Sequence, residues 1–310
     1  MVAPDSQVDE ALAERIDALR RERRAVILAH NYQRPEVQDV ADIVGDSLAM
    51  AREAAQTDAD VILLCGVHFM AETAKLLNPD RPVLVPDPNA GCPMADMTAP
   101  RELAEAKRQH PDAAVVAYVN SSARVKAMAD ICCTSANAVQ VVESIPAETP
   151  ILFVPDQSLA DYAAEQTGRD NVILWPGFCP THHHILAEHV EARRAQHPDA
   201  EVLVHPECTR QVRHMADFIG STSQMIRYVT ASPKQAFIIG TEFGVCHTIR
   251  KANPEKDIIQ ISSLADCPNM KLNTLEKIVW ALEDMAHEVQ VPADVASDAR
   301  RAIERMLEVS

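Results

Sequence analysis

The feature that most constrains this chain is a pattern that recurs every 87 or 88 residues. A Cys-Pro pair stands at Cys92, Cys179 and Cys267, so 87 residues separate the first two cysteines and 88 the second two. The segment QHPDA also occurs twice, beginning at Gln109 and at Gln196, again 87 residues apart. Because a constant period marks a structural unit that is copied along a chain, the sequence predicts three similar units.

Other elements follow the same period. In each copy a short apolar run ends in a polar pair, and a hydroxyl residue follows before a helix-like stretch. The polar pairs are His30 and Tyr32, Tyr118 and Asn120, and His205 and Glu207, and the hydroxyls are Ser47, Ser135 and the Ser221/Thr222 pair. Two further apolar runs precede each Cys-Pro, so every copy is expected to contain three strands.

Short β-branched runs that alternate with helical segments are typical of parallel βαβ units with helices on both faces. We therefore predict an α/β protein of three similar three-layer αβα domains with parallel sheets, arranged around a pseudo-threefold axis. The predicted domains are 1–98, 99–183 and 184–272, and the helical stretch 273–310 is expected to pack on the first. Ligands of parallel sheets bind beyond the carboxyl ends of the strands, so the active site is expected at the central junction.

Composition restricts the class of protein. Of the 310 residues, 47% are hydrophobic and 24% charged, as in ordinary globular domains. The longest apolar runs fall far short of the ~20 residues that cross a bilayer, and no secretory signal pattern is present. We therefore expect a cytoplasmic protein without membrane association. The formal net charge of −16 argues against a nucleic-acid-binding surface.

The cysteines indicate metal chemistry. No C-x-x-C pair is present, which disfavours zinc-ribbon and thioredoxin-like sites. Three periodic thiolates, Cys92, Cys179 and Cys267, are suited to an iron–sulfur cluster, because soft sulfur ligands hold iron. Three ligands leave the fourth iron of a cubane open to bind a substrate as a Lewis acid. The other cysteines share no period and are expected to be core residues: Cys65, Cys132, Cys133, Cys208 and Cys246.

A zinc site is an alternative from the same residues. His182 lies three residues after Cys179 and could complete a Cys₃His tetrahedron with the three thiolates. The sequence leaves this alternative open. Of the histidines at 182–184, only His182 is expected to face the site, because adjacent residues of a helix point in different directions.

The periodic polar residues suit a site for a small anion. The hydroxyls at Ser47, Ser135 and Ser221/Thr222 are expected as helix N-caps. Helix N-termini bind carboxylate and phosphate groups, so three of them around one cavity would hold a small polyanion. The imidazole, phenol and carboxylate groups after the first strands are suited to proton transfer, because burial and neighbouring groups move their pKa values.

Longer segments, taken in order, resemble the quinolinate synthase family of de novo NAD biosynthesis. They are AHNYQ, VGDSLAMA, CGVHFMAETAKLL, AGCPMADM, AYVNSSARVKAMADICCTSANA, WPGFCPTH, VHPEC, IGSTSQM and CPNMKLNTLEK, which extend from about residue 24 to about residue 280. The resemblance implies an enzyme that condenses iminoaspartate with dihydroxyacetone phosphate to quinolinate, releasing phosphate and two waters. It also implies a [4Fe-4S] cluster held by Cys92, Cys179 and Cys267.

The resemblance further implies roles for individual residues. Tyr32 and Glu207 resemble the acid/base pair of the family, and His182 resembles a histidine beside the cluster. Substrate contacts are implied for His30, Ser47, Tyr118, Val119, Asn120, Ser135, His205, Pro206, Glu207 and Thr222. The implied partners are the two small substrates and, through metabolism, the enzyme that supplies iminoaspartate. A disulfide switch beside the third ligand is not expected, because ISSLADCPNMK lacks the second cysteine that some members carry.

Two other classes of protein remain as alternatives. An iron–sulfur sensor would carry a DNA-binding or partner-binding module, and the sequence has neither a helix-turn-helix signature nor a basic region. A zinc-dependent hydrolase would use a metal-bound water and would be colourless.

Overall fold

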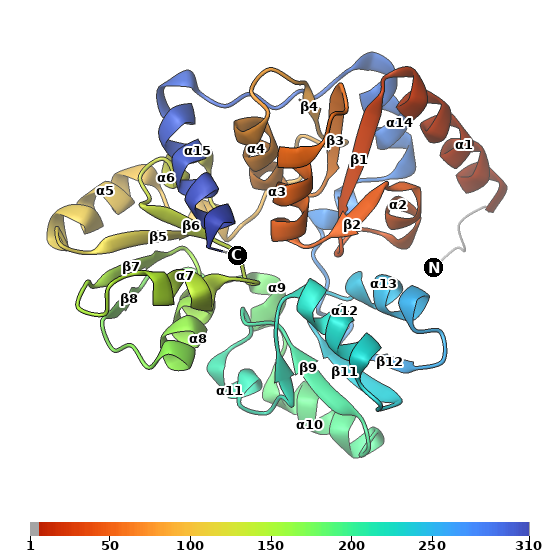
Figure 1. The fold of residues 1–310 in the computed structure, drawn as a ribbon. Helices are drawn as coiled ribbons and strands as arrows, with labels where there is room; N and C mark the ends of the chain where they lie inside the picture. Colours follow the sequence, from red (N-terminus) through yellow and green to blue (C-terminus); the bar gives the residue numbers. More distant parts are fainter. Residues whose placement is uncertain (1–5, 310) are drawn as a thin grey trace. The chain divides into compact units, whose positions relative to one another are not determined.

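The structure is a computed structural model that describes residues 6–309. It contains three four-stranded sheets in which every pair of neighbouring strands is parallel (Figure 1). The strand orders are β2-β1-β3-β4, β6-β5-β7-β8 and β10-β9-β11-β12. The order is the same in all three, which confirms the predicted α/β class and the three similar parallel sheets.

The elements of the three repeats follow one another in the same sequence. The first comprises α1 (Ser6–Glu22), β1 (Ala25–His30), α2 (Pro35–Val40), β2 (Ile43–Gly45), α3 (Ser47–Gln56), β3 (Val61–Cys65), α4 (His68–Leu77) and β4 (Val83–Leu84). The second comprises η1 (Ala95–Met97), α5 (Pro100–Gln109), β5 (Ala114–Tyr118), α6 (Ala123–Lys126), β6 (Ile131–Cys133), α7 (Ala138–Ser144), β7 (Ile151–Val154), α8 (Gln157–Thr167) and β8 (Val172–Leu174).

The third repeat comprises α9 (Pro180–His183), α10 (Ala187–Gln196), β9 (Glu201–Val204), α11 (Arg210–Arg213), β10 (Phe218–Ile219), α12 (Thr222–Ala231), β11 (Ala236–Gly240), α13 (Val245–Ala252) and β12 (Asp257–Gln260). It is followed by η2 (Met270–Leu272), α14 (Leu275–Asp284) and α15 (Ala293–Glu308). The expected count of three strands per repeat is wrong by one. The missed strands, β2, β6 and β10, have only two or three residues, too few to give a periodic signal.

An aspartate at the start of each of these short strands makes the same contacts in every repeat. The carboxylates of Asp42, Asp130 and Asp217 each accept a hydrogen bond of 2.8 Å from a backbone N–H near the start of the neighbouring first strand. The backbone N–H of each aspartate donates to the carbonyl of that same strand residue, at 3.0, 2.9 and 2.8 Å. The three repeats therefore share these side-chain contacts as well as the order of their strands.

Contacts between elements divide the chain into two units. The first contains residues up to 92 together with 267–292, and the second contains 93–266 together with the residues from 293 onward. In the first unit, α1 and α14 pack together on the sheet, with Ile16, Leu19 and Ile278 buried against Ile27 and Leu63 (Figure 1). In the second unit, α15 packs on α6 and β6.

The expectation that all of 273–310 packs on the first repeat is therefore wrong for α15. Helix α14 ends at Asp284, and the next residue, Met285, has a left-handed backbone with a φ of 49°. The chain then pairs with β4 through hydrogen bonds from Val85 to His287 and from Val289 to Val83. Pro292 directly precedes α15. The domain boundaries 98/99 and 183/184 and the pseudo-threefold axis stay predictions. In the described part of the chain, no helix has the length and apolarity needed to cross a membrane.

Candidate active site

The periodic polar residues lie at the carboxyl ends of the central strands. His30 and Tyr118 are the last residues of β1 and β5, and His205 directly follows β9. All three side chains are buried, as are those of Tyr32 and Glu207. In each sheet the chain leaves the first strand toward one side and returns on the other, which creates the switch point where parallel sheets bind ligands.

In the first unit, hydrogen bonds join the segments that carry Cys92, Cys267 and Tyr32. The Asn269 side chain donates to the carbonyl of Gly91, the neighbour of Cys92, at 2.9 Å. Lys271 donates its backbone N–H to the carbonyl of Cys267 and its ammonium to the carbonyl of Tyr32. The two cysteine loops and the Tyr32 loop are therefore held beside one another within this unit.

His30 and Tyr32 also contact each other. The Nδ1 atom of His30 accepts a hydrogen bond of 3.1 Å from the backbone N–H of Tyr32, and the two rings meet edge to face at 4.6 Å. The equivalent pair in the third repeat has the same contact, because Nδ1 of His205 accepts from the N–H of Glu207 at 3.3 Å. In both repeats the Nδ1 atom of the imidazole is thus fixed by its own loop.

In the second unit, a buried cluster forms around His182. Cys179 is the N-cap of α9 and Pro180 follows it, so His182 comes one turn later and its Nδ1 lies 3.1 Å from the Cys179 Sγ. The same Nδ1 lies 2.7 Å from an Oε2 of Glu207, and its Nε2 lies 2.8 Å from the hydroxyl of Thr241. The His205 ring stacks on His182 with centroids 4.6 Å apart.

The second and third repeats both contribute to this cluster. The Nε2 atom of His205 lies 3.1 Å from the hydroxyl of Ser135, which follows β6. Tyr118, at the end of β5, gives Glu207 a side-chain hydrogen bond. Asn120 has a buried Oδ1 atom without a hydrogen-bond partner among the described residues. An unsatisfied buried oxygen beside a polar cluster needs an explanation, and a bound polar ligand supplies one.

Two buried carboxyl groups of this unit have opposite pKa shifts. Burial alone would raise the pKa of Glu207, but the neighbouring imidazoles of His182 and His205 and the hydrogen bonds that Glu207 accepts from His182 and Tyr118 hold the pKa well below its ordinary value. Asp156, directly after β7, has a pKa raised well above its ordinary value by burial and by the charge of Glu207. The pKa values of Glu207 and Asp156 are therefore moved in opposite directions, which is a division that acid/base sites use.

Sequence reasoning missed Asp156 and Thr241. Asp156 accepts a hydrogen bond from the N–H of Leu159 at 2.7 Å and so caps α8, while its other oxygen is buried without a partner among the described residues. Both residues follow the third strand of their repeat. A search for polar residues after those strands, in VPD and GTE, would have found them.

The hydroxyl residues are not the N-caps that were expected, with the exception of Ser221. Asp46 caps α3 by accepting from Ala49, and Ser221 caps α12 by accepting from Gln224. Ser47 and Thr222 are the first residues inside these helices, and Ser135 lies before the N-cap of α7. Since other residues cap α3 and α12, the hydroxyls of Ser47 and Thr222 are not needed for capping.

The histidines at 182–184 have different surroundings. His183 stacks on Phe178 and lies 2.9 Å from the hydroxyl of Ser158, and His184 is exposed. Val119 and Pro206, which were implied as substrate contacts, are buried in the loops after β5 and β9. Of the three histidines, His182 alone belongs to the group of Cys179, His182 and Glu207, whose ligand atoms lie within 4.8 Å of one another.

The cysteines fall into two classes of burial. Cys92, Cys179 and Cys267 are half-buried, whereas the other five are buried. Burial raises the pKa of Cys132 to about 12 and raises those of Cys65, Cys133 and Cys208 as well, so these sulfurs remain thiols. Because the sulfurs of the three half-buried cysteines are the more accessible ones, they are better placed to bind a soft metal, and they fit an iron–sulfur cluster.

A Cys₃His zinc site fits less well. The Nδ1 atom of His182 lies 2.7 Å from an oxygen of Glu207, which is the distance of a direct hydrogen bond. The other ring nitrogen of His182 contacts Thr241, so both nitrogens already have protein partners.

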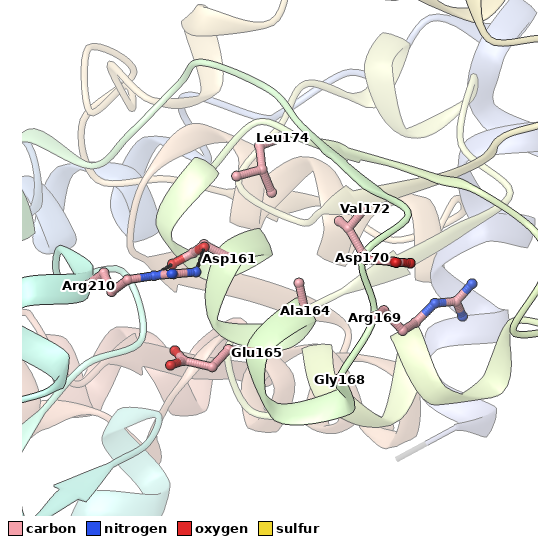
Figure 2. A pocket seen from close by; sticks show the side chains of 9 residues that line it. All are labelled: Asp161, Ala164, Glu165, Gly168, Arg169, Asp170, Val172, Leu174 and Arg210. Atoms are coloured by element: carbon pink, nitrogen blue, oxygen red, sulfur yellow. Dashed lines mark hydrogen bonds and ion pairs between the residues drawn. The ribbon is translucent and has the colours of Figure 1, made fainter.

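A separate hollow of about 360 Å³ lies beside α8 (Figure 2). It is lined by Asp161, Ala164, Glu165, Gly168, Arg169, Asp170, Val172, Leu174 and Arg210. None of these residues was predicted to act in the site. The figure shows Arg210 and Asp161 pointing toward each other, and the Nε of Arg210 donates to Asp161 at 2.8 Å.

Comparison with known proteins gives one family. The family described as NadA, quinolinate synthetase A protein, matches residues 14–308. A quinolinate synthase of Trichormus variabilis is 50% identical over 300 residues, which cover 95% of this chain and 92% of the relative. Quinolinate synthases of Dehalococcoides mccartyi (51%, covering 97% and 99%) and Methanosarcina barkeri (52%, covering 96% and 97%) are similarly close.

Proposed function

The chain belongs to the quinolinate synthetase A family and has the function of a quinolinate synthase, and we propose that it performs this function at the site described above. In this proposal iminoaspartate and dihydroxyacetone phosphate condense to quinolinate with loss of phosphate and two waters. The observation that carries the assignment of the site is the cluster that half-buried Cys179 forms with the buried side chains of His182, Glu207 and His205. The loops after the first strands of all three repeats are proposed to face one shared cavity around a pseudo-threefold axis.

Cys92, Cys179 and Cys267 are proposed to hold a [4Fe-4S] cluster. Support comes from their partial exposure and from the hydrogen bond between Asn269 and Gly91, which joins two of the three loops. When bound, such a cluster supplies a Lewis acid at the iron that lacks a cysteine. Every other role is assigned to side chains of this chain.

Glu207 and Tyr32 are proposed to move protons. Glu207 lies beside the imidazoles of His182 and His205 and is proposed to accept a proton from substrate carbon or oxygen. His182 donates from Nδ1 to Glu207 and holds that carboxylate in one orientation. Tyr32 would deliver a proton from its phenol to a departing hydroxyl.

The remaining polar residues are proposed to bind the substrates. Helices α3 and α12 begin at Ser47 and Thr222, and the N–H groups and hydroxyls at a helix N-terminus suit carboxylate and phosphate groups. His30, His205 and Ser135 add donors, and the unsatisfied oxygen of Asn120 accepts a hydrogen bond from substrate. Tyr118, Val119 and Pro206 are proposed to line the rest of the substrate-binding site. The enzyme that supplies iminoaspartate is the expected metabolic neighbour.

The cluster is tested by anaerobic preparation of the protein with iron and sulfide analysis. We expect a brown protein with about four irons and four sulfides per chain. Replacing Cys92, Cys179 or Cys267 by serine should remove the colour, and Cys132→Ser, the matched buried control, should keep it. A colourless, active preparation with stoichiometric zinc would refute the proposal.

A second experiment tests the open iron. Pyridine-2,3-dicarboxylate can chelate one metal through its ring nitrogen and neighbouring carboxylate. With the unique iron labelled, the Mössbauer isomer shift should change when this ligand is added. An unchanged shift at saturating ligand would show that the iron does not bind the product.

A further inference from the structure

A buried polar side chain occupies the same position in the short helix that follows the first strand of each repeat. The three residues are Gln38 in α2, Lys126 in α6 and Arg213 in α11, spaced by 88 and 87 residues. Only 4%, 0% and 1% of their surfaces are exposed. Burying an amide, an ammonium or a guanidinium costs free energy unless it is hydrogen-bonded, so their partners are informative.

Gln38 contacts the backbone on both sides of Tyr32. Its Nε2 donates to the carbonyl of Asn31 at 3.1 Å and to the carbonyl of Gln33 at 2.8 Å. Because one amide group ties together the residue before and the residue after Tyr32, the backbone dihedrals of Tyr32 are restricted. The direction of the phenol is restricted with them.

Arg213 contacts the backbone on both sides of Glu207 in the same way. Its Nη1 donates to the carbonyl of Cys208 at 2.9 Å and lies 3.4 Å from the carbonyl of Pro206. The same Nη1 donates to Ser158, and Nη2 donates to Asp161 at 2.6 Å. Glutamine and arginine share neither shape nor charge, so the feature that recurs is the donor itself.

We propose that Gln38 and Arg213 are positioning residues that fix Tyr32 and Glu207 for proton transfer. Lys126 is the corresponding residue of the second repeat, in the helix that follows the loop carrying Asn120. This inference rests on the proposed roles of Tyr32 and Glu207. Displacing a reacting group by about 1 Å can cost a factor of ~10², so loss of a positioning contact should reduce turnover strongly.

The test uses Gln38, because its side chain carries no charge and makes no ion pair that would complicate folding. Gln38→Met removes both donors at similar volume and should lower kcat by about 10- to 100-fold with little change in KM. Gln38→Lys, which copies the residue of the second repeat, restores a donor and should recover most of the lost kcat.

Asn78 provides a matched control in the same unit. It is buried and its Nδ2 also donates to two backbone carbonyls, those of Ala54 at 2.7 Å and Ala74 at 3.1 Å. Asn78→Leu should lower stability about as much as Gln38→Met but leave kcat within a factor of about two. An equal loss of kcat in the two variants would overturn the proposal, because both would then act through stability alone.

A second readout needs neither activity nor cluster. The chain has only four tyrosines, so protein labelled with ¹³C in the tyrosine rings gives a small set of signals, and Tyr32→Phe identifies that of Tyr32. In apoprotein the Tyr32 signal should move in Gln38→Met and stay in place in Asn78→Leu. A Tyr32 signal unmoved in Gln38→Met would refute the positioning role. Full activity of Tyr32→Phe would instead refute the proposed role of Tyr32, whatever the spectra show.

Discussion

Replacing Arg213 by methionine should destabilise the second unit by about 3 kcal/mol. Methionine is unbranched and fills the space of the arginine stem, but it has no donors. The Arg213 side chain is fully buried, and the variant therefore tests what a buried guanidinium contributes here.

The magnitude follows from its partners. The carbonyl of Cys208 loses its 2.9 Å donor, and a buried acceptor left unsatisfied costs about 1–3 kcal/mol. The carbonyl of Ser158 also loses a 2.9 Å donor but keeps its bond within α8, so only the net contribution of a bond from a charged donor is lost, about 1.5–3 kcal/mol. Asp161 keeps Arg210 as a partner, so no buried charge is left alone. The sum of about 2.5–6 kcal/mol is partly offset because the guanidinium no longer has to be desolvated.

The assay is urea unfolding of the apoprotein at pH 7, followed by circular dichroism. When both proteins show the same dependence of unfolding free energy on urea concentration, the shift in the urea midpoint reports the change in unfolding free energy. Arg210→Met is the matched control, because Arg210 binds the same carboxylate with a side chain that is 57% exposed (Figure 2). It should cost no more than about 1 kcal/mol. Equal effects of the two variants would refute the reasoning.

Three further predictions follow from single residues. Tyr32→Phe and Glu207→Gln should each keep the colour of the cluster and lose about 10²- to 10⁴-fold in kcat, and a loss of less than twofold would exclude a role in proton transfer. Asp130→Ala leaves the buried N–H of Val115 unpaired and should cost about 1–3 kcal/mol in urea unfolding; an unchanged midpoint would show that the repeated aspartate contact contributes nothing. Asp156 has a raised pKa in the folded state. The unsubstituted protein should therefore lose unfolding free energy as the pH rises from ~3.9, the ordinary pKa of an aspartate, toward the raised pKa. Asp156→Asn cannot ionise, so its unfolding free energy measured against pH should lack this decline.

The repeat and the sheet class were predictable because each apolar strand recurs at a fixed interval. The contacts of Asp42, Asp130 and Asp217 follow the same interval but were not predicted, because aspartates are common and their bond to the strand is visible only in three dimensions. The packing of α15 was not predictable, because an amphipathic pattern shows which face is buried and not which sheet covers it.

The candidate site was predictable in part for a similar reason. Residues at the period, such as His205 and Glu207, could be found by comparing the copies. Thr241 and Asp156 were missed because their roles arise from contacts made in one repeat only, such as the bond between Thr241 and His182. The sequence period finds residues that the three repeats share, whereas a contact made in one repeat only is visible only in the folded structure.

The position of α15 has a consequence for folding during synthesis. Its buried face, with Ala299, Ile303 and Met306, packs on strand and helix residues that the ribosome makes roughly 170 residues earlier. At a synthesis rate of about 5–20 residues per second, α15 is made on the order of ten seconds after the strand and helix that it covers in the second repeat. All four strands and both helix layers of the third sheet lie between residues 187 and 260, and so that sheet can be complete first. The order in which the sheets mature during translation should therefore differ from their order in the chain.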